Sequence, residues 1–203
     1  MFVGNIWETI FRRQGKTLHD LTQEIDFGLL HRFELGIENE LGLVGSDAHE
    51  TSATVEARYA FANWNAIPLN PAISGEYIFG VGTSVKNATS DKDLRRQANA
   101  VAVRCLLGQS FADHFGYGLN IGFQQDVSRD SGRGIEISQS VAYGAMKGKL
   151  EFGAEMRYVH NTSQRNSDDR DGLVTGPTFG WKPTRQLRIS LARYLVALAI
   201  RRV

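Results

Sequence analysis

The chain has 203 residues, enough for one domain with a full core or for one barrel. Its net charge of +1 gives no electrostatic reason to expect nucleic-acid binding, and its single cysteine, Cys105, excludes an intramolecular disulfide and a cysteine-based metal site. No apolar run approaches the roughly 20 residues that a membrane-spanning helix needs.

The first 16 residues have a pattern of their own. Their apolar residues recur at helical spacing, and Arg12, Arg13 and Gly15 are typical of the end of a helix. Glu8 interrupts the apolar stretch, so the segment does not match a signal peptide. We therefore expect residues 1–16 to be an N-terminal extension with a short amphipathic helix, and residues 17–203 to form a single β domain.

After residue 20, large apolar residues alternate with small or polar ones in ten segments at hairpin spacing. No helical crossover separates these segments, so the pattern predicts an all-β, antiparallel up-and-down barrel of about ten to twelve strands. The connections alternate between longer polar linkers, at 44–53, 80–98, 127–134 and 160–172, and mostly shorter ones. The expected strands are 24–29, 33–41, 54–61, 73–79, 101–107, 115–123, 135–144, 150–158, 173–181 and 187–191.

The segment "FGYGLNIGFQQDV", residues 115–127, shows that each strand has an oily face and a small, polar face. A soluble barrel turns the oily face inward, and a membrane barrel turns it toward lipid. Three observations favour lipid. All six lysines fall outside the expected strands, glycines crowd the polar face, and that face carries paired charges such as Glu56 with Arg58 and Glu155 with Arg157. Aromatic residues near the strand ends fit interfacial girdles.

The polar face supplies the candidate site. Its acidic excess predicts a cation preference if water fills the lumen, and the open alternative is that these groups pair and plug the barrel. The lumen-facing candidates are Glu34, Glu38, Glu56, Arg58, Glu76, Arg104, Glu136, Glu151, Glu155, Arg157 and Arg188. Three further acids are assigned to the same face, namely Glu24, Asp26 and Glu40.

The sequence gives little support for a metal site or for an enzyme active site. The segment "NSDDRDG" offers Asp168, Asp169 and Asp171 as oxygen ligands for calcium, but it lacks the spacing of an EF-hand, and a solvated outer loop is favoured. The five histidines show no ligand spacing, and no nucleophile has a nearby base. We expect no enzymatic activity, no cofactor and no resident metal.

Four segments resemble those of uncharacterised, porin-like β-barrel proteins of Gram-negative outer membranes: "EIDFGLLHRFELGI", "EARYAFANW", "NPAISGEY" and "GPTFGWKPT". The resemblance covers roughly residues 20–192. It implies a closed barrel in the bacterial outer membrane, with the lipid bilayer as partner and no known substrate. The expected function is a passive small pore, or a structural or surface barrel, and the alternative is a soluble carrier of a small apolar ligand. The chain lacks an export signal and a terminal aromatic strand, so we expect it to be incomplete at one or both ends.

Overall fold

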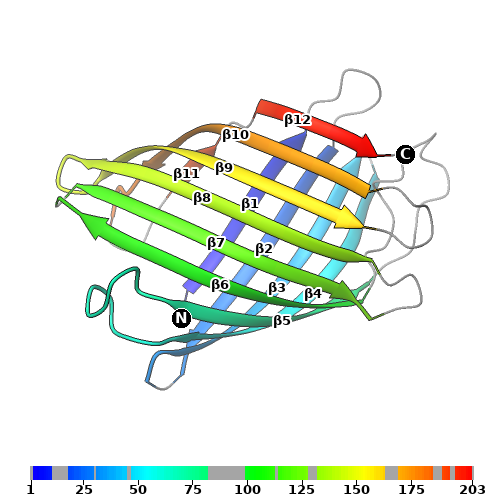
Figure 1. The fold of residues 1–203 in the computed structure, drawn as a ribbon, viewed down its shortest axis with the longest axis horizontal. Coiled ribbons are helices and arrows are strands. Elements are labelled where there is room, and N and C mark those ends of the chain that lie inside the picture. The colour runs from blue at the N-terminus through cyan, green and yellow to red at the C-terminus, as the bar shows by residue number, and fades with distance from the viewer. Residues whose placement is uncertain are drawn as a thin grey trace. The chain divides into compact units, whose positions relative to one another are not determined.

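The structure is a computed structural model that describes residues 2–10, 18–29, 31–44, 47–81, 99–112, 114–127, 132–162, 169–184, 189–192 and 195–202. All the regular elements in these ranges are β-strands (Figure 1). They are β1 (Phe2–Ile10), β2 (Leu18–Gly28), β3 (Phe33–Val44), β4 (Asp47–Ala60), β5 (Ala72–Gly80), β6 (Ala100–Phe111), β7 (Phe115–Asp126), β8 (Arg133–Ala145), β9 (Leu150–Thr162), β10 (Asp169–Trp181), β11 (Ile189–Ala192) and β12 (Leu195–Arg202). Within the same ranges, no helix has the length and apolar character that crossing a membrane requires.

The strands pair in sequence order, from β1 to β11, which is the order of an up-and-down barrel. The predicted all-β fold with ten to twelve antiparallel strands is confirmed, and the ten expected segments correspond to β2–β11. Both β11 and β12 pair with β10, the first along Thr178–Trp181 and the second along Asp169–Thr175. Pro177, which has no backbone N–H to donate, lies in the break between these two pairings.

The prediction of an N-terminal helix is wrong. Residues Phe2–Ile10 form strand β1, which pairs with β2 along its whole length, from Phe2 opposite Asp26 to Ile10 opposite Leu18. The apolar spacing of a short segment fits a helix as well as a strand, and a tertiary partner decides between them. Here the edge of β2 provides hydrogen-bond partners for the whole segment.

Two of the predicted polar linkers are also largely strand. The expected linker 44–53 contains only a two-residue gap, because β3 continues to Val44 and β4 begins at Asp47. Likewise β9 continues to Thr162 and β10 begins at Asp169. The ladder joins backbone groups, so polar side chains do not end it. Most of the linker 80–98 lies outside the described residues.

The chain divides into two compact units. Unit 1 comprises Met1–Tyr59, Ser74–Ala102 and Asp126–Arg129, and unit 2 comprises Ala60–Ile73, Val103–Gln125 and Asp130–Val203.

In both units the sheet has an exposed apolar face and a more buried polar face. Ile37 of unit 1 is 49% exposed and Phe152 of unit 2 is also 49% exposed, whereas Glu76 and Ser138 are each only 8% exposed. Within the described residues, the buried hydrophobic side chains are limited to Ile78, Ala100 and Ala102. In both units the large apolar side chains are therefore more exposed than the polar side chains of the opposite face.

Candidate functional site

The register of β2, β3 and β4 assembles carboxylates into rows on the polar face of unit 1. Residues directly opposite each other in an antiparallel pair project to the same face, about 4.5–5.5 Å apart at Cβ. The rows are Gly28–Glu34–Arg58, Asp26–Gly36–Glu56 and Glu24–Glu38–Thr54. No Lys and no Arg other than Arg58 occurs in these three strands, so the predicted acidic excess is concentrated here.

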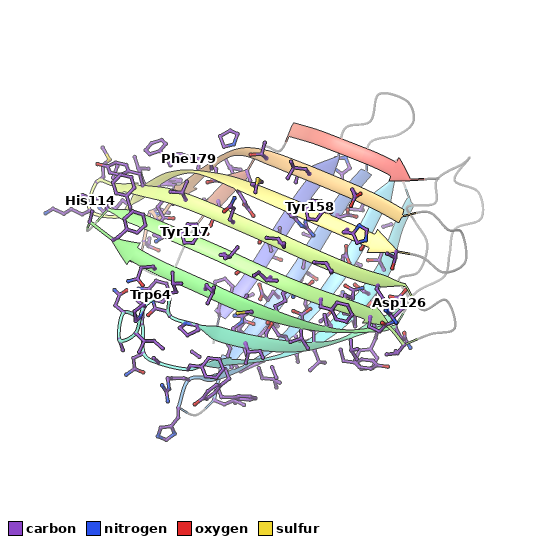
Figure 2. The ribbon with its side chains drawn as sticks, viewed as in Figure 1. Trp64, His114, Tyr117, Asp126, Tyr158 and Phe179 are labelled. Carbon is purple, nitrogen blue, oxygen red and sulfur yellow. The ribbon has the colours of Figure 1, made fainter. Side chains whose placement is uncertain are left out.

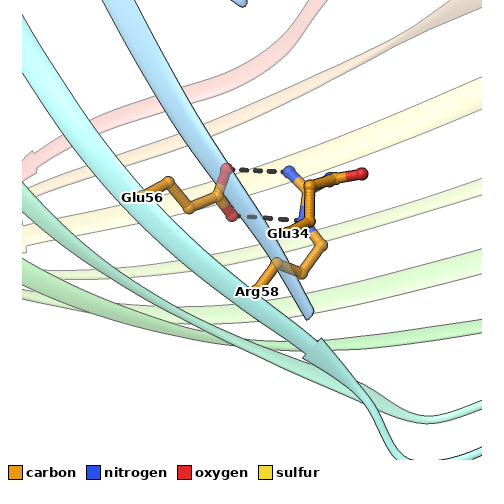
Figure 3. Close-up of polar contacts among 3 residues, drawn as sticks. All are labelled: Glu34, Glu56 and Arg58. Carbon is orange, nitrogen blue, oxygen red and sulfur yellow. Dashed lines mark hydrogen bonds and ion pairs between the residues drawn. The ribbon is translucent and has the colours of Figure 1, made fainter. Parts of the chain in front are cut away.

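Arg58 is bonded to two of these carboxylates. Figure 3 shows its pairing with Glu56. Its Nη1 donates to Glu34 Oε1 at 2.6 Å, and its Nη2 donates to Glu56 Oε2 at 2.7 Å. A longer bond from Nε to Glu56 Oε1, at 3.3 Å, makes the pairing with Glu56 bidentate. The side chain of Glu56 is 16% exposed and those of Arg58 and Glu34 are 33% and 37% exposed, so solvent only partly screens these ion pairs.

Gly36 makes room for two carboxylates that flank it. A Cβ at this position would lie 2.8 Å from Asp26 Oδ1 and 3.6 Å from Glu56 Oε2. Asp26 is 6% exposed, and its Oδ1 has no hydrogen-bond partner among the described residues. The glycine therefore brings a buried carboxylate close to the Glu56–Arg58 pair without connecting the two.

The remaining predicted acids of unit 1 have different surroundings. Glu38 lies opposite Glu24, which places like charges side by side. Glu40 Oε2 accepts a hydrogen bond of 2.9 Å from Ser52 Oγ. Glu76 is buried in β5, two residues from the fully buried Ser74.

On the polar face of unit 2, acids and bases are paired more evenly. Arg157 Nη2 donates to Glu136 Oε2 at 2.8 Å, and Lys182 Nζ donates to Glu151 Oε1 at 2.7 Å. Arg104 packs its stem over Gly122, where a Cβ would lie 3.2 Å from Arg104 Cγ.

Two predicted lumen-facing residues, Glu155 and Arg188, remain to be placed. Glu155 lies opposite Ser140 and Gly176 on the polar face of unit 2. Arg188 lies outside the described residues.

The predicted calcium loop is in part a strand. Asp168 lies outside the described residues, and Asp169 and Asp171 belong to β10. Asp171 Oδ1 accepts a hydrogen bond from the Tyr158 hydroxyl and lies 2.7 Å from His160 Nδ1, so it is already engaged. The described part of the chain contains no group of three His, Cys, Asp or Glu side chains that could hold a metal ion.

The contact between His160 and Asp171 escaped the sequence analysis because both residues fell in the expected linker 160–172. A signal was present. His160 continues the alternation of Met156 and Tyr158, and Asp171 stands two residues before Leu173 on the corresponding face of β10.

The apolar face of unit 2 carries a row of aromatic rings near the short turns. Phe115 lies opposite Tyr143, Tyr143 opposite Phe152, and Phe152 opposite Phe179. The ring centroids of Phe115 and Tyr143 are 5.1 Å apart, and those of Phe152 and Phe179 are 5.4 Å apart. Figure 2 shows Phe179 toward the end of the strands where His114 lies, and Tyr158 toward the other end.

Charged side chains avoid the middle of this apolar face. On the apolar face of β7–β10, an uncharged stretch covers residues 115–123, 135–143, 150–158 and 173–181. Beyond one end of this stretch, the same face carries Arg133, His160 and Asp171. Nine strand residues rise about 30 Å, and tilted strands of about 9–11 residues cross a bilayer. The band therefore has the length of a membrane-spanning strand.

Comparison of the chain with models of known protein families gives no match, and comparison with curated proteins gives none either.

Proposed function

We propose that the protein is a passive β-barrel of the bacterial outer membrane, with the apolar face toward lipid and the polar face toward an acidic lumen. One observation carries the proposal: large apolar side chains are exposed along the strands, while small and polar side chains are buried. Soluble monomers rarely expose contiguous apolar patches of more than a few hundred Å². The uncharged band bounded by an aromatic row supports the same environment.

The alternative function, a soluble carrier, would need the apolar face to enclose its ligand. The buried side chains on the other face are instead mostly polar, such as Ser52, Thr54 and Asp26, with Ile78, Ala100 and Ala102 as the buried apolar ones among the described residues. Such a lining suits water, ions or polar solutes better than an apolar ligand.

The acidic face of unit 1 favours a lumen that admits cations over anions, by the logic of charged rings in channels. Ion pairs on the polar face, such as Arg157 with Glu136, would fill part of the proposed lumen. If water still passes, the barrel conducts small ions. If the paired side chains fill the lumen, its role is structural. Both roles are passive, and both follow from the same orientation of the sheet.

Membrane insertion is tested by refolding the urea-unfolded chain in the presence of phospholipid vesicles and separating bound from free protein by flotation. The proposal expects the folded chain to float with the vesicles and to need detergent to stay monomeric without them. A chain that remains a soluble monomer without detergent would refute the membrane location.

Conduction is tested in planar bilayers with a salt gradient. A pore predicts a reversal potential of cation-selective sign, which moves toward zero when Glu38, Glu56 and Glu155 are replaced by Gln. An inserted protein that carries no current would reject the pore and leave the structural role.

A further inference from the structure

We infer that the polar face of unit 1 around Gly36 is a binding site for an organic cation that carries a guanidinium or primary ammonium group. The inference deepens the proposed function, since it rests on a polar face that solutes can reach. The strand register places four acidic residues in two adjacent rows there: Glu24 and Glu38 in one, Asp26 and Glu56 in the other.

Within β2, β3 and β4, the acidic side chains of the polar face outnumber the basic ones. Arg58 is the only Arg or Lys in β2, β3 and β4, and it is already bonded to Glu34 and Glu56. Glu24 lies directly opposite Glu38, an arrangement of like charges that weakens a sheet. A bound cation would relieve this repulsion.

Asp26 supplies the independent observation. It is more than nine-tenths buried, and its Oδ1 lies over Gly36 without a hydrogen-bond partner among the described residues. A buried carboxylate oxygen without a donor is costly, because it has lost its hydration and gained nothing in return. The oxygen is therefore an acceptor ready for the N–H group of a ligand.

The same face shows which kind of cation it recognises. Arg58 spans two carboxylates with separate N–H groups, at 2.6 Å from Glu34 and 2.7 Å from Glu56. A single metal ion needs several oxygens converging on one point, and no such group exists among the described residues. A ligand with several N–H donors can instead donate hydrogen bonds to carboxylates that do not converge on one point, as Arg58 does.

Two ligands test the inference with the wild-type chain in detergent, measured by titration calorimetry. Agmatine carries a guanidinium and a primary ammonium group, whereas tetramethylammonium carries a positive charge without any N–H donor. The site predicts at least about tenfold tighter binding of agmatine, because hydrogen bonds to charged groups contribute that much. Equal binding of the two ligands, or no binding of agmatine, would overturn the inference.

Variants locate the site. Asp26→Asn should weaken agmatine binding about tenfold or more. Gly36→Ala keeps all charges but places a methyl group 2.8 Å from Asp26 Oδ1, and it should block the same position. The matched control is Glu40→Gln, which changes a carboxylate that already accepts from Ser52 and should leave the affinity nearly unchanged. If the control loses as much affinity as Asp26→Asn, the binding is diffuse and the assigned site is wrong.

Vesicle flotation of the same preparation separates this inference from the proposed function. A chain that inserts into vesicles but does not distinguish agmatine from tetramethylammonium refutes the binding site alone. A chain that binds agmatine but stays soluble without detergent refutes the membrane location alone.

Discussion

A single arginine placed on the apolar face distinguishes lipid from water as its surroundings. Ala154 stands at the centre of the uncharged stretch of β9, is exposed, and lies opposite Val141 and Pro177. Because alanine is small, Ala154→Arg removes almost no packing. Ser140, one strand away, lies on the polar face opposite Glu155, so Ser140→Arg is a matched control that adds the same charge to the other face.

The two environments predict different magnitudes. Near the middle of a bilayer, Ala154→Arg should lower the free energy of unfolding by about 2–4 kcal/mol. That is a decrease of about 30- to 700-fold in the folding equilibrium constant, at a factor of ten per 1.4 kcal/mol. On a water-exposed strand the same substitution should change stability by less than about 0.5 kcal/mol. The control Ser140→Arg should stay within that smaller range in either environment, since its guanidinium can pair with Glu155.

The measurement is equilibrium urea unfolding in phospholipid vesicles, followed by tryptophan fluorescence. Wild type and both variants are compared under conditions in which folding is reversible. If Ala154→Arg and Ser140→Arg are equally stable, the apolar face does not contact hydrocarbon and the orientation argument fails. If the control is the more destabilised of the two, the polar face is the one that faces lipid.

Three further outcomes follow from the structure. Gly153→Ala should destabilise the chain by about 1–3 kcal/mol, because a Cβ there overlaps the backbone of β8, whereas Gly116→Ala, with open space at its Cβ, should be nearly neutral in the same urea titration. Arg58→Gln should cost roughly 1–2 kcal/mol, discounted for its partial exposure, since it leaves two acids without their partner; a loss that does not shrink at high salt would contradict an electrostatic cause. Cys105, exposed on the apolar face of β6, should react with a water-soluble maleimide in urea and be protected after folding into vesicles; equal labelling in both states would contradict burial in lipid.

Most of the strands could be predicted from the sequence because a period of two is a local property. The alternation from Phe115 to Phe123 exists whichever strands lie beside it, and the same holds for each of β2–β10. The division of each strand into an apolar and a polar face was also predictable, because glycines and charged residues such as Glu56 and Arg58 fall two positions apart.

Features that depend on a neighbouring strand became known only from the tertiary structure. Residues Phe2–Ile10 have a spacing that fits a helix, and only the free edge of β2 makes them a strand. Pro177 marks where the neighbours of β10 divide into β11 and β12, which no local pattern shows.

The composition of the site has the same origin. The sequence supplied an excess of acids on one face, but the register of β2, β3 and β4 determined which acids meet. It placed Gly36 between Asp26 and Glu56, and it brought Glu34 within reach of Arg58. Alternation along one strand specifies only the face on which a side chain lies. Its neighbours across the ladder depend on how the strands align, and that alignment forms only when the sheet does.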